Sequence, residues 1–178
     1  MIMRLFASKY PADVMGIILV DSTHEKRFSG PDFSKFRRME QKKHRNLLRL
    51  GYLLSPIAVP RLIKRHIGAK RLPFNIQQIV NALGYRNNAY KAAYLEFLSI
   101  LESAEQLHKS QPLKSEMPII VLSAGRQSKE WIETQKELLK LTMNTKHFVV
   151  GESWHSIHIH HPQAVIDSVI CLLSDGKS

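Results

Sequence analysis

Four histidines lie within seven residues near the C-terminus, at His155, His158, His160 and His161. They follow an apolar run at residues 147–150 and precede an amphipathic run at 163–173, an order that predicts a strand, a loop and a helix. Imidazole changes charge close to neutral pH, so it can take up a proton and return it. A histidine on such a loop is typical of the general base in α/β enzymes.

A metal site is the alternative interpretation of a histidine cluster. Such a site needs ligands that converge at a defined geometry, and no cysteine or carboxylate stands at a known ligand spacing here. We therefore predict no metal and no cofactor. His158, His160 and His161 are expected to be loop or helix-entry residues, and a surface role remains an alternative for His155.

The composition is that of a globular domain. The chain has 178 residues, of which 44% are hydrophobic and 23% charged, enough for one domain with a sizeable core. No apolar run approaches the roughly 18 residues of a membrane span, and the first residues lack the features of a signal peptide. Cys171, the lone cysteine, is expected to be a small buried hydrophobe. We expect a cytoplasmic protein.

The apolar pattern predicts an α/β fold with a parallel sheet. Continuous apolar runs, typical of strands covered on both faces, occupy Val14–Val20 and Met117–Leu122, and a third strand is expected at His147–Val150. Helical periodicity is expected at residues 2–9, 129–141 and 163–173. We predict three parallel strands with flanking helices and a helical insertion after the first strand.

The predicted insertion, residues 31–113, is helical with breaks at prolines and at Gly84, and it holds the basic charge. Residues 35–71 contain twelve lysines and arginines but one acidic residue, Glu40, whereas the whole chain has a net charge of +11. Such a segment could lie on an anionic membrane surface, attract acidic substrates or form a solvated outer face. Nucleic-acid binding is disfavoured, because no recognised motif or aromatic stacking platform is present.

Two segments resemble the α/β-hydrolase family. Residues 4–25, which include Tyr10-Pro11 and Leu19-Val20-Asp21-Ser22, resemble the stretch that follows the nucleophile elbow in these enzymes. Ser153-Trp154-His155, followed by Ile157-His158 and Pro162, looks like the loop that carries the catalytic histidine. The resemblance covers the second half of the family's fold. It implies a hydrolase core at 1–30 and 114–178 and a cap or lid at 31–113.

The resemblance implies that His155 is the catalytic base and requires an acid to orient it. Many relatives place that acid after the strand that corresponds to 119–122, but the loop here has no carboxylate before Glu130. Others place it after the preceding strand, where this chain has Asp21. Asp21 is therefore the candidate acid, with Glu130 and Glu25 as alternatives, unless Asp21 only caps the turn that follows it.

The sequence departs from the family in one large respect, because no G-x-S-x-G motif occurs in it. By the resemblance, the nucleophile and the oxyanion-hole donors would lie before Met1. We therefore expect a fragment of an esterase- or lipase-like enzyme for small-molecule esters that is inactive alone. The alternative is a non-catalytic interaction domain, in which the exposed edge of the 17–20 strand pairs with an N-terminal half or with a second copy.

Overall fold

The computed structural model describes residues 1–28, 35–68, 70 and 72–175, and these divide into two compact units. Unit 1 comprises residues 1–30 and 103–178, and unit 2 comprises residues 31–102. The boundary falls inside one long helix, α5, so unit 1 begins again at Ser103, whereas the predicted insertion runs to residue 113. Ala104 and Leu107, on the last turns of α5, are buried.

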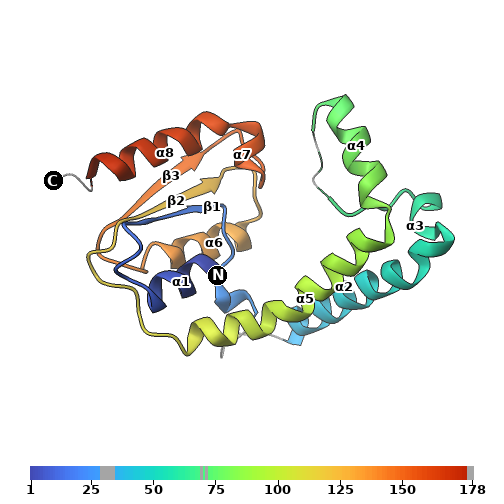
Figure 1. Ribbon diagram of the computed structural model, residues 1–178, viewed down its shortest axis with the longest axis horizontal. Coiled ribbons are helices and arrows are strands. Elements are labelled where there is room, and N and C mark those ends of the chain that lie inside the picture. The colour runs from blue at the N-terminus through green and yellow to red at the C-terminus, as the bar shows by residue number, and fades with distance from the viewer. Residues whose placement is uncertain (29–34, 69, 71, 176–178) are drawn as a thin grey trace. The chain divides into compact units, whose positions relative to one another are not determined.

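Unit 1 is built on a three-stranded parallel sheet in the order β1-β2-β3 (Figure 1). The strands are β1 (Ile17–Val20), β2 (Ile119–Ala124) and β3 (Thr145–Val150). This sheet confirms the predicted fold class. β1 starts three residues later than predicted, and residues 14–16 lie outside it.

Helices cover both faces of the sheet, as Figure 1 shows. One face packs against α1 (Ile2–Lys9) and α6 (Lys129–Leu138), and its buried cluster includes Ala7, Leu19 and Leu138. The other face packs against α7 (Ile157–His160) and α8 (Pro162–Asp175), with Leu122 and Leu172 in its cluster. Every residue of the central strand β2 is buried, which explains its continuous apolar run.

Local signals set the ends of these elements. The hydroxyl of Ser128 accepts a hydrogen bond from the backbone N–H of Trp131 and thereby caps α6. Tyr10 ends α1, directly before Pro11. A short 3-10 helix, η1 (Glu25–Arg27), follows β1, with His24 as its N-cap.

Unit 2 is helical in its described residues. It contains α2 (Lys35–Leu54), η2 (Ser55–Ile57), α3 (Val59–Leu62), α4 (Phe74–Gly84) and most of α5 (Asn87–His108). Tyr90 of α5 is buried against α2, where a side chain in place of Gly51 would collide with its ring. Tyr52 and Tyr94 stack with ring centroids 6.5 Å apart.

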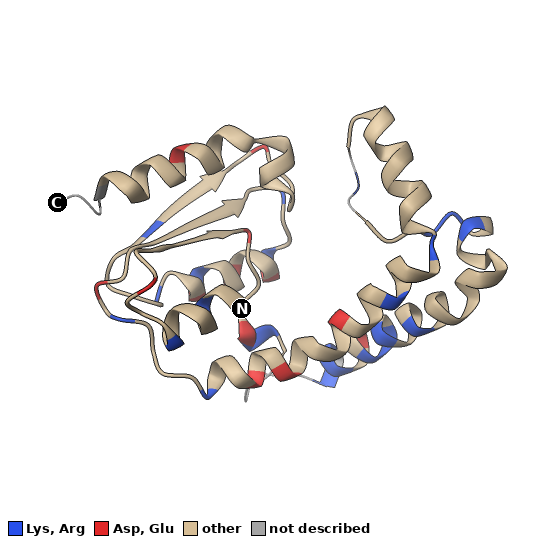
Figure 2. Cartoon of the chain, viewed as in Figure 1, with Lys and Arg blue, Asp and Glu red and all other residues tan. Residues whose placement is uncertain are grey.

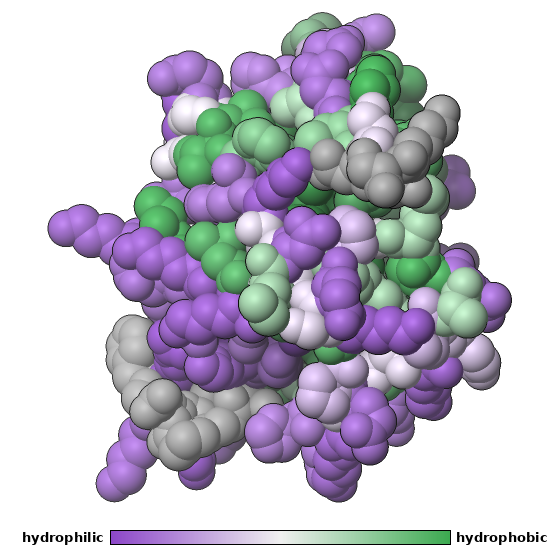
Figure 3. All heavy atoms as spheres, turned by 90° about the vertical axis from the view of Figure 1, so that its left-hand side faces the viewer, coloured by the Kyte–Doolittle hydropathy of each residue, from purple (hydrophilic) through white to green (hydrophobic). Residues whose placement is uncertain are grey.

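Apolar side chains also reach the surface of the chain. Figure 3 shows hydrophobic areas between hydrophilic ones on one face. On β3, Phe148 and Val149 are exposed, although the strand is apolar. Within the described residues, no helix is long and apolar enough to cross a membrane.

Candidate active site

The carboxyl ends of the three strands bring the two predicted site residues together. Asp21 follows the last residue of β1, and His155 lies in the loop between β3 and α7. The Nδ1 atom of His155 lies 2.8 Å from Oδ2 of Asp21, although 134 residues separate the two positions. This end of a parallel sheet is where α/β proteins commonly place their functional groups.

Asp21 is held in an unusual local conformation. Its φ is +41°, in the left-handed region that aspartate and asparagine tolerate better than most residues. Its backbone N–H donates to the carbonyl oxygen of Leu122, which joins the end of β1 to β2. The side chain is fully buried.

The Asp21 carboxylate accepts four hydrogen bonds. Oδ1 accepts from the backbone N–H of Ala124 at 3.0 Å and from the indole N–H of Trp131 at 2.9 Å. Oδ2 accepts from the amide nitrogen of Gln127 at 2.7 Å and from His155. Two carboxylate oxygens offer about four lone-pair sites, so the acceptor capacity of this buried group is filled.

These contacts fix the protonation of the pair. Burial acts to raise the pKa of Asp21, but its four hydrogen bonds outweigh burial and lower the pKa below its ordinary value. An ionised carboxylate only accepts hydrogen bonds, so Nδ1 of His155 is the donor. The hydrogen bond to Asp21 raises the pKa of His155, against a smaller opposing effect of burial.

The other ring nitrogen of His155 is the one available for chemistry. The side chain is 66% exposed, and Nε2 has no hydrogen-bond partner among the described residues. The Trp131 ring meets the imidazole edge-to-face with centroids 5.4 Å apart, so it restrains the imidazole from the side. Below its raised pKa the ring is charged, and above it Nε2 carries a free lone pair that can accept a proton.

Backbone hydrogen bonds hold the His155 loop against the loop after β2. The N–H of Gly125 donates to the carbonyl of Val150 at 2.9 Å, and the N–H of Arg126 donates to that of Ser153 at 3.0 Å. A side chain at position 125 would place its Cβ 2.3 Å from the carbonyl oxygen of Gly151. The two loops therefore approach more closely than a side chain there would allow.

The alternative acids have other positions. Glu25 pairs with the buried Arg4 through two hydrogen bonds, of 2.5 and 3.0 Å. Burial acts to raise the pKa of Glu25, but its bonds to Arg4 lower it overall. Glu130 lies in the first turn of α6, and no hydrogen bond joins it to His155.

Two serine hydroxyls in the loops and strands around the site, those of Ser153 and Ser123, are engaged elsewhere. Ser153 is completely buried, and its hydroxyl donates to the carbonyl of Trp154. Ser123 lies inside β2, where its hydroxyl meets Nε2 of His147 at 2.9 Å and Oε1 of Gln135 at 3.3 Å. In the described part of the chain, no serine hydroxyl is bonded to Nε2 of His155.

The remaining histidines do not form a metal centre in the described residues, where no group of three or more potential ligands converges. His158 and His160 belong to α7, a short helix, and His161 directly follows it. Cys171 is half-buried on α8. No sequence pattern indicates the roles of Gln127 and Trp131, since a side-chain donor can reach a carboxylate from any position along the chain. A related feature of the sequence is that the loop after β2 contains side-chain hydrogen-bond donors and no carboxylate.

Comparisons with known proteins agree with this architecture. Neither models of protein families nor curated protein sequences matched the chain. Solved structures did, among them MenH from S. aureus, with 14% identity, a TM-score of 0.54 and coverage of 97% of this chain and 65% of that one. The ancestral haloalkane dehalogenase AncHLD2 gave 15% identity, a TM-score of 0.61 and coverage of 98% and 64%.

A variant of an epoxide hydrolase from Bacillus megaterium matched with 17% identity and a TM-score of 0.52, over 97% of this chain and 65% of that one. The chain thus spans about 65% of the length of the structures it matches. Identities this low bear on fold alone. Together with the parallel sheet, the matches show that the chain has part of the α/β-hydrolase fold.

Proposed function

We propose that this chain carries the proton-transfer part of a hydrolase site that cleaves a carboxylic ester or a similar acyl bond. His155 is the general base, and Asp21 is the acid that orients it. The observation that supports this proposal is the hydrogen bond from Nδ1 of His155 to a buried carboxylate, which leaves Nε2 accessible.

In this mechanism, Nε2 takes the proton of a nucleophile's hydroxyl while the oxygen attacks the carbonyl carbon of the substrate. The imidazolium that forms is stabilised by ionised Asp21, whose pKa is lowered. His155 then gives the proton to the departing alcohol. The base next activates a water molecule, which hydrolyses the acyl intermediate and restores the nucleophile.

The nucleophile of this proposal is not among the 178 residues, since the sequence contains no G-x-S-x-G. It would come from a polypeptide segment that adds to unit 1. The open edge of β1 supports this idea, because β1 has only β2 beside it in the described sheet. Ile2 and Met3 of neighbouring α1 are also exposed apolar residues that such a segment could cover.

The test begins with the codons upstream of Met1. An in-frame G-x-S-x-G there identifies the segment, and the extended protein is then assayed on p-nitrophenyl esters. We expect hydrolysis that His155→Ala reduces by at least about a thousandfold, since removal of a triad member costs that much or more. The 178-residue chain alone is expected to be inactive.

Three outcomes would contradict this proposal. One is ester turnover by the extended protein that His155→Ala leaves unchanged. Another is an upstream reading frame without a nucleophile motif, which would favour a non-catalytic interaction domain. The third is activity confined to epoxides or haloalkanes, the substrates named for two of the matched proteins, because these would replace the acyl bond as the substrate class.

A further inference from the structure

A group of the basic residues of unit 2 lies on one face of α2. Six of its lysines and arginines are exposed, and we call these the basic face: Lys35, Arg38, Lys42, Lys43, Arg45 and Arg49. Figure 2 shows this concentration of positive charge along the helix. At 100° per residue, Glu40, the only acidic residue of α2, lies on the opposite side from the middle of this face.

Large apolar side chains share the exposed side of α2 with these charges. Met39, Leu50 and Leu53 are 62%, 52% and 58% exposed, whereas the buried Leu48 lies on the opposite side of α2. The exposed apolar surface continues past the helix at Ile57 and Leu62. Charges mixed with several exposed large apolar side chains are typical of helices that lie at an interface.

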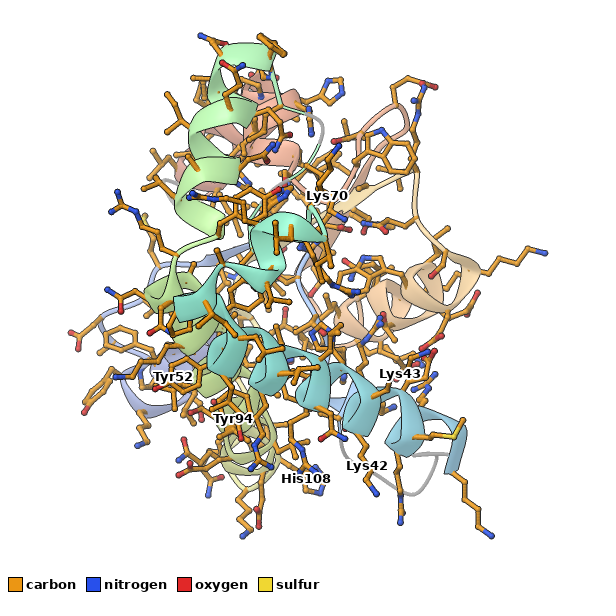
Figure 4. The ribbon with its side chains drawn as sticks, turned by 90° about the vertical axis from the view of Figure 1, so that its right-hand side faces the viewer. Lys42, Lys43, Tyr52, Lys70, Tyr94 and His108 are labelled. Carbon is orange, nitrogen blue, oxygen red and sulfur yellow. The ribbon has the colours of Figure 1, made fainter. Side chains whose placement is uncertain are left out.

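A shallow hollow lies at the edge of the basic face. Arg38, Lys42 and Arg45 of α2 line it together with Phe97 and Leu101 of α5, and its volume is about 230 Å³. Cations on one wall and apolar groups on the other suit an anionic group attached to a hydrocarbon chain. Figure 4 looks onto this side of α2 and labels Lys42 and Lys43.

We propose that the basic face binds an anionic phospholipid bilayer, with α2 lying parallel to the membrane surface. The cations would contact lipid phosphates and carboxylates, and Met39, Leu50 and Leu53 would enter the boundary between headgroups and acyl chains. The phosphates of a nucleic acid would bind the cations of the basic face, but Met39, Leu50 and Leu53 would then lack an apolar partner. The mixture of charge and exposed apolar area therefore favours the bilayer.

The test is co-sedimentation of the full chain with phosphatidylcholine vesicles, with and without phosphatidylserine. Binding is expected only when phosphatidylserine is present, and it should weaken as salt is added. The triple variant Lys42→Gln, Arg45→Gln, Arg49→Gln removes three neighbouring charges from the basic face. Its affinity should fall by about a hundredfold, because each basic residue near such a surface contributes about a fivefold factor.

A matched control removes the same charge from unit 1. The variant Lys9→Gln, Lys114→Gln, Lys129→Gln also removes three exposed positive charges and should bind within about threefold of the parent chain. A second variant, Leu50→Ser with Leu53→Ser, keeps every charge. It should bind anionic vesicles at least about tenfold more weakly, because the lost apolar burial is substantial.

The proposal is overturned if both triple variants lose affinity equally, since net charge alone would then explain binding. It is also overturned if neutral vesicles bind as well as anionic ones, or if the double leucine variant binds normally. Tighter binding to a DNA duplex than to anionic vesicles, unaffected by the leucine substitutions, would identify a nucleic acid as the partner instead. Circular dichroism of each variant shows whether its helices are intact.

Discussion

At the scale of single residues, Asp21 and His155 differ in how many contacts of the folded structure depend on them. Asp21 is fully buried and accepts four hydrogen bonds, whereas the His155 side chain is 66% exposed. Removal of the carboxylate leaves the buried backbone N–H of Ala124 and the half-buried side chains of Trp131 and Gln127 without their acceptor. Removal of the imidazole, by contrast, deletes a side chain that is mostly in contact with solvent.

We therefore predict that Asp21→Ala lowers the free energy of unfolding by about 3 kcal/mol, because buried donors lose their acceptor. His155→Ala should lower it by less than about 1 kcal/mol. Urea denaturation of both variants measures the two values. Equal losses would show that Asp21 does not organise the loops around it.

The sequence identified both members of the pair but not their surroundings. His155 and Asp21 could be named because a strand that ends in Leu-Val-Asp-Ser and a histidine loop resemble a known pattern. The roles of Trp131 and Gln127 could not be predicted, because each residue contributes a single side-chain donor that only folding brings to the carboxylate. The contacts depend on where folding places α6, which carries Trp131, and the loop after β2, which carries Gln127.

At the scale of elements, the order of strands and helices could be predicted better than their ends. β1 is apolar at every position and β2 at every position before Ser123, a pattern typical of strands covered on both faces. The apolar pattern places the end of α6 at Leu141, but the helix stops at Leu138, and two turn residues and a bend follow. Apolar periodicity continues through such a turn, so the pattern does not show where hydrogen bonding stops.

The close approach of the loops after β2 and β3 gives a prediction for a pair of glycines. Gly125→Ala should lower the free energy of unfolding by about 2 kcal/mol, because its Cβ would meet the backbone of Gly151. Gly151→Ala should change it by less than about 0.5 kcal/mol, because nothing lies within 4 Å of that Cβ. Thermal unfolding of both variants measures the two losses of stability. A larger loss for Gly151→Ala than for Gly125→Ala would contradict the close contact between the two loops.

At the scale of the whole molecule, the candidate site belongs to one unit. His155, Asp21 and the three other groups that bind the Asp21 carboxylate all lie in residues 1–30 and 103–178. Unit 2 has its own buried residues, with Tyr90 packed against α2. The proton-transfer pair and the basic face therefore occupy different units.

This division predicts that damage to unit 2 spares the pair. Tyr90→Ala should lower the free energy of unfolding of unit 2 by about 3 kcal/mol, because it removes a large buried side chain. The pKa of His155 should stay the same within about 0.2 units. Nuclear magnetic resonance of the imidazole signals measures that pKa, and a clear shift would mean that the pair depends on unit 2.

The titration of His155 reports directly on the hydrogen bond between its Nδ1 and ionised Asp21. Long-range proton–nitrogen spectra recorded across the pH range follow both imidazole nitrogens. The hydrogen bond to Asp21 predicts a His155 pKa above the ordinary value of about 6.5, with the proton on Nδ1 once the ring is neutral. In Asp21→Asn the pKa should fall. A His155 pKa at or below the ordinary value, unchanged by Asp21→Asn, would contradict the hydrogen bond between ionised Asp21 and Nδ1 of His155.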